Sequence, residues 1–134
     1  MQAWFADTYY FLALRNPKDE GHAKAVAATG RLAPRQLVTT NWVLTEVADA
    51  LAKPANRLGF AELMEMLAAN PDVVIVPPTL SLFDQGVSFY NARPDKEWSL
   101  TDCISFVVMT QLGIIEALTA DHHFQQAGFV ALLK

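Results

Sequence analysis

Short apolar runs along the chain alternate with longer segments in which apolar residues recur at helical spacing. The clearest strand is Val73–Val76, four β-favouring residues closed by Pro77-Pro78, and we expect it to be fully buried. Further strands are predicted over Ala3–Ala6, Gln36–Thr39, Ala117–Ala120 and Phe129–Leu132. Helices, the third of them capped by Asn41, are predicted over Thr8–Arg15, Asp19–Thr29, Asn41–Leu51, Arg57–Ala69, Leu80–Asn91 and Leu100–Leu112.

This alternation of strands and helices predicts an α/β fold, a mostly parallel sheet of four or five short strands with helices on both faces. The chain has 134 residues, close to the commonest size of a domain, so we expect residues 1–134 to form one domain without a linker. In such a sheet the carboxyl ends of the strands share one edge, and ligand sites form there.

Composition excludes several classes of protein. With 52% apolar and 18% charged residues, the chain is too apolar to be a disordered segment. Its single cysteine, Cys103, excludes an internal disulfide and a cysteine-based zinc site, and it suits a reducing cytoplasm. The start has no basic segment typical of a secretory signal, and no uncharged stretch reaches the ~18 residues of a membrane span. A net charge of −4 argues against a broad basic surface for nucleic acid.

Of the fourteen acidic residues, three stand out because of where they fall relative to the predicted elements. Asp7 and Asp121 each follow a predicted strand directly and precede a helical segment. Asp102 lies three residues after Ser99, at the head of a helix that is apolar on nearly all sides, in a pattern that resembles a capping box. Each of the three is also a candidate for an ordinary helix N-cap, and position alone leaves open whether it has this structural role or a role in a functional site.

Glu46 stands out for a different reason, since it lies at the edge of the apolar arc of its helix. Val43, Val47 and Ala50 belong to that arc at 100° per residue, whereas Asp49 falls on the polar side. A carboxylate at the border of a core costs desolvation unless another group pairs with it. The alternative is a side chain that reaches out to solvent.

Together these four carboxylates predict a cation site at the carboxyl edge of the sheet. Carboxylates that converge there would repel one another, and Mg²⁺ or Mn²⁺ with oxygen ligands would remove that repulsion. The chain offers no set of cysteine or histidine ligands for zinc: His122 and His123 are adjacent, so they cannot share one helical face, and we expect both in a loop. His22 is expected to be an exposed helix residue.

The ordered set of motifs resembles the PIN domain family over the whole chain. The pattern is Asp7 after the first strand, Glu46 in a helix, Ser99-x-x-Asp102 opening an apolar helix, and Thr119-x-Asp121-x-x-Phe124. The stretch from Trp98 to Ser105 is especially similar to bacterial VapC-type members. Each motif is weak alone, but all four acidic positions match in identity and order. The resemblance implies a PIN-like three-layer α/β/α sandwich.

The resemblance also implies a metal-dependent ribonuclease that cleaves single-stranded RNA, commonly the toxin of a toxin–antitoxin pair. Asp7, Glu46, Asp102 and Asp121 would hold one or two Mg²⁺ or Mn²⁺ ions, which would activate a water and stabilise charge on the scissile phosphate. Thr8 and Ser99 are candidates to orient these carboxylates or a bound water. Expected partners are RNA, an antitoxin protein and a second copy of the chain, and no membrane.

Substrate contacts are predicted in the loop that precedes Ser99. Arg93 and Lys96 could hold phosphates there, and Trp98 could stack on an unpaired base. The alternative is a solvated loop with Trp98 packed beneath it.

The prediction of a homodimer starts from helices Asn41–Leu51 and Arg57–Ala69, which carry more apolar residues than one sheet face requires. The residues in excess are Trp42, Leu63, Met64, Met66 and Leu67.

Two other classes of protein fit the sequence less well than a nuclease does. A PIN-like protein that only pairs with itself and an antitoxin would not need the complete acidic set. A phosphoacceptor receiver domain needs an Asp at the end of its central strand, where this chain has Pro77-Pro78.

Overall fold

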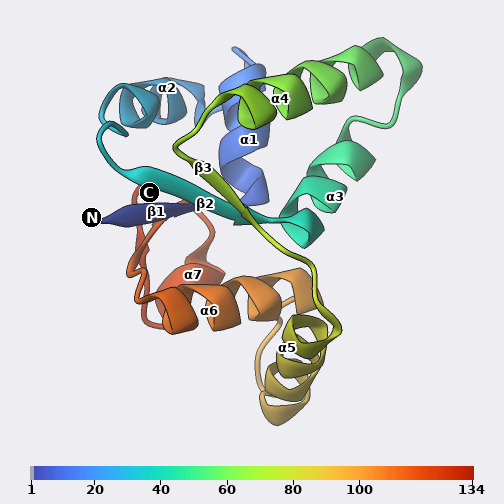
Figure 1. Ribbon diagram of the computed structural model, residues 1–134, viewed down its shortest axis with the longest axis vertical. Helices are drawn as coiled ribbons and strands as arrows, with labels where there is room; N and C mark the ends of the chain where they lie inside the picture. Colours follow the sequence, from blue (N-terminus) through green and yellow to red (C-terminus); the bar gives the residue numbers. More distant parts are fainter. Residues whose placement is uncertain (1) are drawn as a thin grey trace.

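Five parallel strands form the centre of the protein, in the order β3-β2-β1-β4-β5. Figure 1 labels β1, β2 and β3. The computed structural model describes residues 2–134. The strands are β1 (Ala3–Ala6), β2 (Gln36–Thr40), β3 (Val73–Val76), β4 (Glu116–Leu118) and β5 (Val130–Ala131). Every pairing is parallel, so the expectation of a mostly parallel sheet is confirmed and extended to all five strands.

Helices cover both faces of this sheet, which confirms the three-layer arrangement (Figure 1). In Figure 1, α1, α2 and α4 lie on one side of the strands and α5, α6 and α7 on the other, while α3 lies at the end of β2. The α-helices are α1 (Thr8–Arg15), α2 (His22–Gly30), α3 (Asn41–Ala50), α4 (Arg57–Ala69), α5 (Leu80–Ala92), α6 (Leu100–Leu112) and α7 (His122–Gln126), with a 3₁₀ turn, η1, over Pro54–Asn56. Within residues 2–134 no helix is long and apolar enough to cross a membrane.

The strand order creates a crevice at the carboxyl ends of β1 and β4. After β3 the chain crosses back over the sheet, so β4 pairs with the free side of β1, with Ala6 opposite Leu118. The segments that follow β1 and β4 leave toward opposite faces, and this reversal is where α/β sheets place their ligand sites. Asp7 and Asp121 directly flank the crevice.

Several local predictions needed correction. Val73–Val76 is a strand, but it is half-buried because it forms an edge of the sheet and pairs only with β2. The N-cap of α3 is Thr40, whose hydroxyl accepts the Val43 amide, and not Asn41. The second helix begins at His22 because Asp19 is in a turn, where its carboxylate accepts the Gly21 amide.

Histidines and apolar residues on helix surfaces also differ from expectation. His22 is half-buried, with its Nδ1 at 2.8 Å from the Ala13 carbonyl. His122 and His123 begin α7 and do not lie in a loop. Leu63 and Leu67, expected in an exposed patch, are buried in the core beneath α4. Met66 on the same helix is exposed.

The core on the side of the sheet that α6 and α7 cover is held together by aromatic rings. Phe124 of α7 is fully buried, with its ring centroid 6.4 Å from that of Phe5 in β1 and 5.0 Å from that of Phe106 in α6. The Phe106 contact is edge-to-face, which is a favourable geometry for aromatic pairs. Phe5 lies two residues before Asp7, Phe106 four residues after Asp102, and Phe124 three residues after Asp121. The packing of the three rings therefore sets the relative positions of the three elements that carry these carboxylates.

Helices α5 and α6 approach closely at Gly86, which is buried against Ile104. A Cβ added to Gly86 would clash with the Ile104 side chain, whereas one added to Gly30 would meet nothing within 4 Å. The two helices therefore require a residue without a side chain at this crossing.

We expect Gly86→Ala to destabilise the protein by ~1–3 kcal/mol, because the extra methyl group overpacks the α5–α6 crossing. Gly30→Ala, also in a helix but in open space, should leave the free energy of unfolding unchanged or raise it slightly. Urea denaturation of both variants measures the difference. Equal stability of the two would contradict the close approach.

Candidate functional site

The four acidic residues predicted from the sequence line one cavity of about 530 Å³ at the carboxyl edge of the sheet. Asp7 follows β1, Glu46 lies in α3, Asp102 in the first turn of α6, and Asp121 at the start of α7. The remaining lining residues are Thr8, Tyr9, Leu12, Glu97, Ser99, Ala120 and His123. Within residues 2–134 this lining includes no lysine or arginine, so the cavity is strongly acidic.

Asp7 occupies the N-cap position of α1, but its side chain makes no capping hydrogen bond. Its Oδ2 instead accepts a hydrogen bond of 2.9 Å from the hydroxyl of Thr119, at the end of β4. The Thr119 hydroxyl in turn accepts the Asp121 amide at 3.0 Å. One fully buried threonine therefore joins the two strand ends, and the structural role first considered for Asp7 does not apply.

Glu46 finds the partner that its position at the core border requires. The Thr8 hydroxyl donates to Oε1 of Glu46 at 2.6 Å, which links the start of α1 to α3. The side chain is half-buried and does not extend freely into solvent.

Asp102 and Asp121 do cap their helices, and they also face the cavity. Asp102 forms the predicted capping box with Ser99, and its Oδ2 accepts the Ser99 amide at 3.2 Å. Oδ1 of Asp121 accepts the His123 amide at 2.9 Å. The imidazole of His123 lies close to both residues, with Nδ1 at 3.1 Å from Oδ2 of Asp102 and 3.4 Å from Oδ1 of Asp121.

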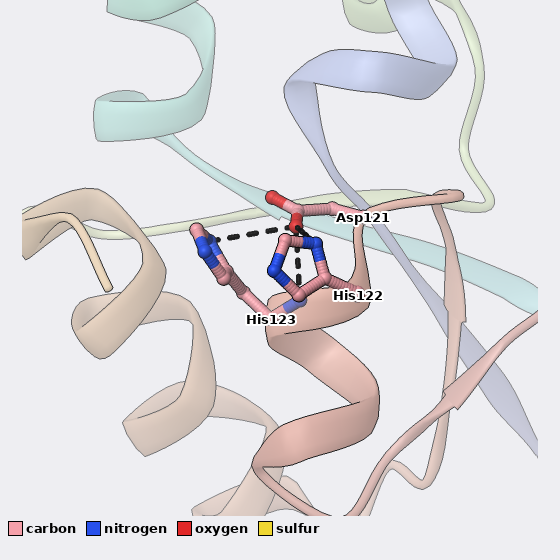
Figure 2. A group of neighbouring side chains, drawn as sticks. All are labelled: Asp121, His122 and His123. Carbon is pink, nitrogen blue, oxygen red and sulfur yellow. Dashed lines mark hydrogen bonds and ion pairs between the residues drawn. The ribbon is translucent and has the colours of Figure 1, made fainter. Parts of the chain in front are cut away.

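The start of α7 places two histidines around one carboxylate (Figure 2). Possible ligand atoms of Asp121, His122 and His123 all lie within 4.8 Å of one another. The two rings differ in exposure, since the side chain of His122 is 61% exposed and that of His123 is 19% exposed. His123 is therefore the histidine that belongs to the cavity.

The hydrogen bonds received by these carboxylates share a common pattern. Within residues 2–134, the hydrogen bonds of 2.6–3.2 Å that these carboxylates accept fall on one oxygen of each: Oδ2 of Asp7, Oε1 of Glu46, Oδ2 of Asp102 and Oδ1 of Asp121. The donor holds the carboxylate in place, and the second oxygen is left available to a cation. Four oxygen donors from four separate elements are typical of a site for Mg²⁺ or Mn²⁺.

Burial has a large effect on the acidity of two of these groups. Asp7 is only 6% exposed, and desolvation raises its pKa to about 7, opposed by the Thr119 hydrogen bond and reinforced by the charges of Asp102 and Asp121. Desolvation also raises the pKa of Asp102, which is 8% exposed. Repulsion between the carboxylates also raises both pKa values, but loss of water is the largest cause, and repulsion ranks after the Thr119 and Ser99 hydrogen bonds that lower them.

The residues predicted to contact substrate lie outside this cavity. Arg93, Lys96 and Trp98 line a separate pocket of about 250 Å³, where both cations lie over the indole ring. Trp98 is 5% exposed and its indole N–H donates to Gln126, so its ring is not free to stack on a base, which corrects that expectation. Arg93 already forms two hydrogen bonds of 2.9 Å with Asp95.

Three residues that line or support the site were not singled out from the sequence. Thr119 was noted only as part of a motif, although a threonine at the buried end of an apolar strand indicates a polar partner. His123 could not be assigned, because its role depends on where α7 meets α6. Glu97, two residues before Ser99, adds a fifth carboxylate to the lining.

Cys103 is not a nucleophile candidate in this site. Its side chain is buried, and desolvation raises the pKa of the thiol to about 11. The thiolate, which is the reactive form, is therefore strongly disfavoured.

These features define a class of protein. The PIN domain family model matches residues 5–130, and the chain belongs to this family. Among known relatives, the chain is 30% identical over 128 residues to the 23S rRNA-specific endonuclease VapC20 from two strains of Mycobacterium tuberculosis, covering 94% of this chain and 95% of the relative.

Solved structures agree on the fold. The crystal structure of VapC20 from Mycobacterium tuberculosis, described as a Sarcin-Ricin loop cleaving toxin, superposes with a TM-score of 0.86 at 27% identity, over 96% of this chain and 97% of that chain. FitAcB from Neisseria gonorrhoeae superposes with a TM-score of 0.63 at 19% identity, over 95% of this chain and 94% of that chain, which is a likeness of fold alone.

The raised pKa of Asp7 predicts how stability without metal depends on pH. The unfolded state releases this proton near pH 4 and the folded state only near pH 7, so the contribution to stability is complete below pH 4 and is lost as the pH rises through 7. A pKa raised from 3.8 to about 7 corresponds to a loss on the order of 4 kcal/mol.

We expect the free energy of unfolding, measured in a chelator, to fall from about pH 4 to about pH 7 and to level off above that. In Asp7→Asn the fall should be much smaller, because the amide does not ionise. Urea titrations of both proteins across this range provide the measurement. A wild-type protein that gains stability over the same range would contradict the buried position of Asp7.

Proposed function

We propose that the protein is an endoribonuclease dependent on Mg²⁺ or Mn²⁺, which hydrolyses phosphodiester bonds in single-stranded RNA and is the toxin of a toxin–antitoxin pair. The observation that carries this proposal is the set of four carboxylates in one cavity, each held through one oxygen. Family membership adds support, since the related VapC20 is named as an endonuclease of ribosomal RNA.

The donor set fits a hard divalent cation. Asp7 and Asp102 are buried beside each other's charge, and the lining includes no lysine or arginine within residues 2–134 to compensate them. Asp7, Glu46, Asp102 and Asp121 would hold the ion through their available oxygens. When bound, such an ion lowers the pKa of a water and neutralises charge on the scissile phosphate.

The residues of the chain itself supply position and selectivity. Thr119 and Thr8 hold Asp7 and Glu46, and Ser99 holds Asp102 as the N-cap of α6. The cavity repels a phosphodiester while its carboxylates are unneutralised, so binding of RNA depends on the cation. No side-chain nucleophile is required, in agreement with the buried thiol of Cys103.

Substrate contacts in this proposal come from Arg93 and Lys96, next to the Ser99 end of α6. Trp98 supports this loop from below and fixes its shape, because both cations lie over its ring. A loop in ribosomal RNA, the substrate named for VapC20, offers the unpaired nucleotides that the proposal requires.

We propose that an antitoxin peptide binds beside the acidic cavity. A second cavity of about 640 Å³ runs between α1 and α4, and Leu12 lines both cavities. Leu51 and Leu58 add apolar surface to it, and polar and charged residues such as Arg15, Asp19 and Glu62 line the rest. We propose that an apolar helix of the antitoxin binds here and brings a basic side chain to the carboxylates.

The first test is cleavage of single-stranded RNA with Mn²⁺ and with a chelator. We expect cleavage only with the ion, and a loss of ~100-fold or more in Asp102→Asn, because this change removes a ligand charge and nearly preserves shape. The control is Asp72→Asn, an exposed carboxylate outside the cavity, which should cleave at the wild-type rate. Wild-type rates in Asp102→Asn would reject the metal site; absence of cleavage with any ion would favour a protein that only binds partners.

The second test uses thermal stability. Mn²⁺ at a hundredfold excess over its Kd should add ~2.7 kcal/mol, or roughly 10 °C in Tm, because it binds the folded site alone. The double variant Asp7→Asn/Asp102→Asn should melt higher than wild type in a chelator and respond little to Mn²⁺. Equal responses of the two proteins to Mn²⁺ would show that these carboxylates do not form one site.

The third test concerns the homodimer, which stays a prediction. Burial of Leu63 and Leu67 removes part of its original basis, but Leu58 and Met66 on α4 and Leu80 on α5 are exposed. We expect light scattering at tens of micromolar to give twice the monomer mass, and Leu80→Glu to shift it toward the monomer. A monomer mass for wild type would reject the dimer.

A further inference from the structure

The imidazole of His123 is the one side chain in the described cavity lining that contacts two of the proposed ligand residues at once. Its Nδ1 lies 3.1 Å from Oδ2 of Asp102 and 3.4 Å from Oδ1 of Asp121. Its backbone amide also donates to Asp121 at 2.9 Å. A single residue of α7 thereby joins a carboxylate of α6 to the one that caps α7.

This contact bears on which oxygen of Asp102 is available to a cation. An ionised carboxylate only accepts hydrogen bonds, so Nδ1–H is the donor. It shares Oδ2 with the Ser99 amide, and both hydrogen bonds of Asp102 fall on this oxygen. With Oδ2 held from two sides, the carboxylate cannot rotate freely, and Oδ1 is the oxygen left for the ion.

The ring of His123 is itself held firmly enough for this role. Phe124, the next residue, is fully buried against Phe106, and Gln126 accepts the indole N–H of Trp98 at 3.0 Å. The first contact fixes α7 against α6, and the second fixes it against the loop that precedes α6. His122 lacks this setting: its side chain is 61% exposed, and its Nδ1 lies 3.6 Å from Asp121 without reaching Asp102.

We propose that His123 is a positioning residue. It holds Asp102 through Oδ2, so that Oδ1 faces the cation, and it keeps the carboxylate of Asp102 next to that of Asp121. This role rests on the proposed metal-dependent function. His123 acts through Asp102 and is not itself a ligand of the ion.

The test measures Mn²⁺ affinity by calorimetry on the full chain, with Tm in a chelator as the check of folding. His123→Ala should raise the Kd for Mn²⁺ by about 10- to 100-fold, the usual effect of losing a group that orients a ligand. His123→Asn should restore most of the affinity, because its amide nitrogen takes the place of Nδ1. His123→Gln, whose amide is one bond further out, should bind as weakly as the alanine variant.

His122→Ala is the matched control, since it removes the neighbouring imidazole without touching Asp102, and it should keep wild-type affinity. Electron spin echo spectra of bound Mn²⁺ should show no directly bonded nitrogen. A nitrogen coupling that disappears in His123→Ala would make His123 a ligand and overturn the positioning role.

The outcomes separate this role from the proposed function. Wild-type affinity in His123→Ala or His123→Gln, together with lost affinity in Asp102→Asn, would overturn the role of His123 and leave the metal site intact. Absence of Mn²⁺ binding by the wild-type protein would overturn the proposed function and, with it, the role that rests on it.

Discussion

The acidic cavity depends on the packing of Phe124 between β1 and α6. Its ring contacts Phe5 and Phe106, and each of the three rings lies within four residues of a carboxylate in the cavity. The aromatic contacts are buried and well packed, so they are stable whatever the charge state of the site. The free energy gained from apolar burial on one side of the sheet therefore holds together carboxylates that would otherwise repel one another.

A cost follows from this arrangement. Asp7 is nearly as buried as the phenylalanines around it, and the raised pKa of Asp7 reflects its lost contact with water. The protein offsets part of this cost with hydroxyl donors, Thr119 to Asp7 and Thr8 to Glu46, since within residues 2–134 no lysine or arginine lines the cavity. Neutral donors hold the carboxylates in place but leave their negative charge uncompensated, which is the state that the proposed cation site requires.

Much of the fold was predictable because local signals and tertiary packing agree. The bounds of β1, α1, α4, β3 and α6 match the expectation from periodicity, and the parallel sheet follows from their alternation. The wrong predictions concern helix starts, where neighbouring side chains compete for the same backbone amides. Thr40 replaces Asn41 as an N-cap because its hydroxyl is in reach of the Val43 amide, and Asp19 closes a turn where a helix was expected.

The sequence by itself determined which residues make the cavity acidic: four carboxylates in a fixed order, two at strand ends, one heading an apolar helix and one at a core border. These properties depend on position along the chain, so they can be identified from the strand and helix periodicity of the sequence. Only the tertiary structure decided that Thr119 and His123 hold these carboxylates and that Trp98 is buried. Such contacts join residues up to 112 positions apart, so they depend on strand order and on the docking of α7 against α6, which no local pattern encodes.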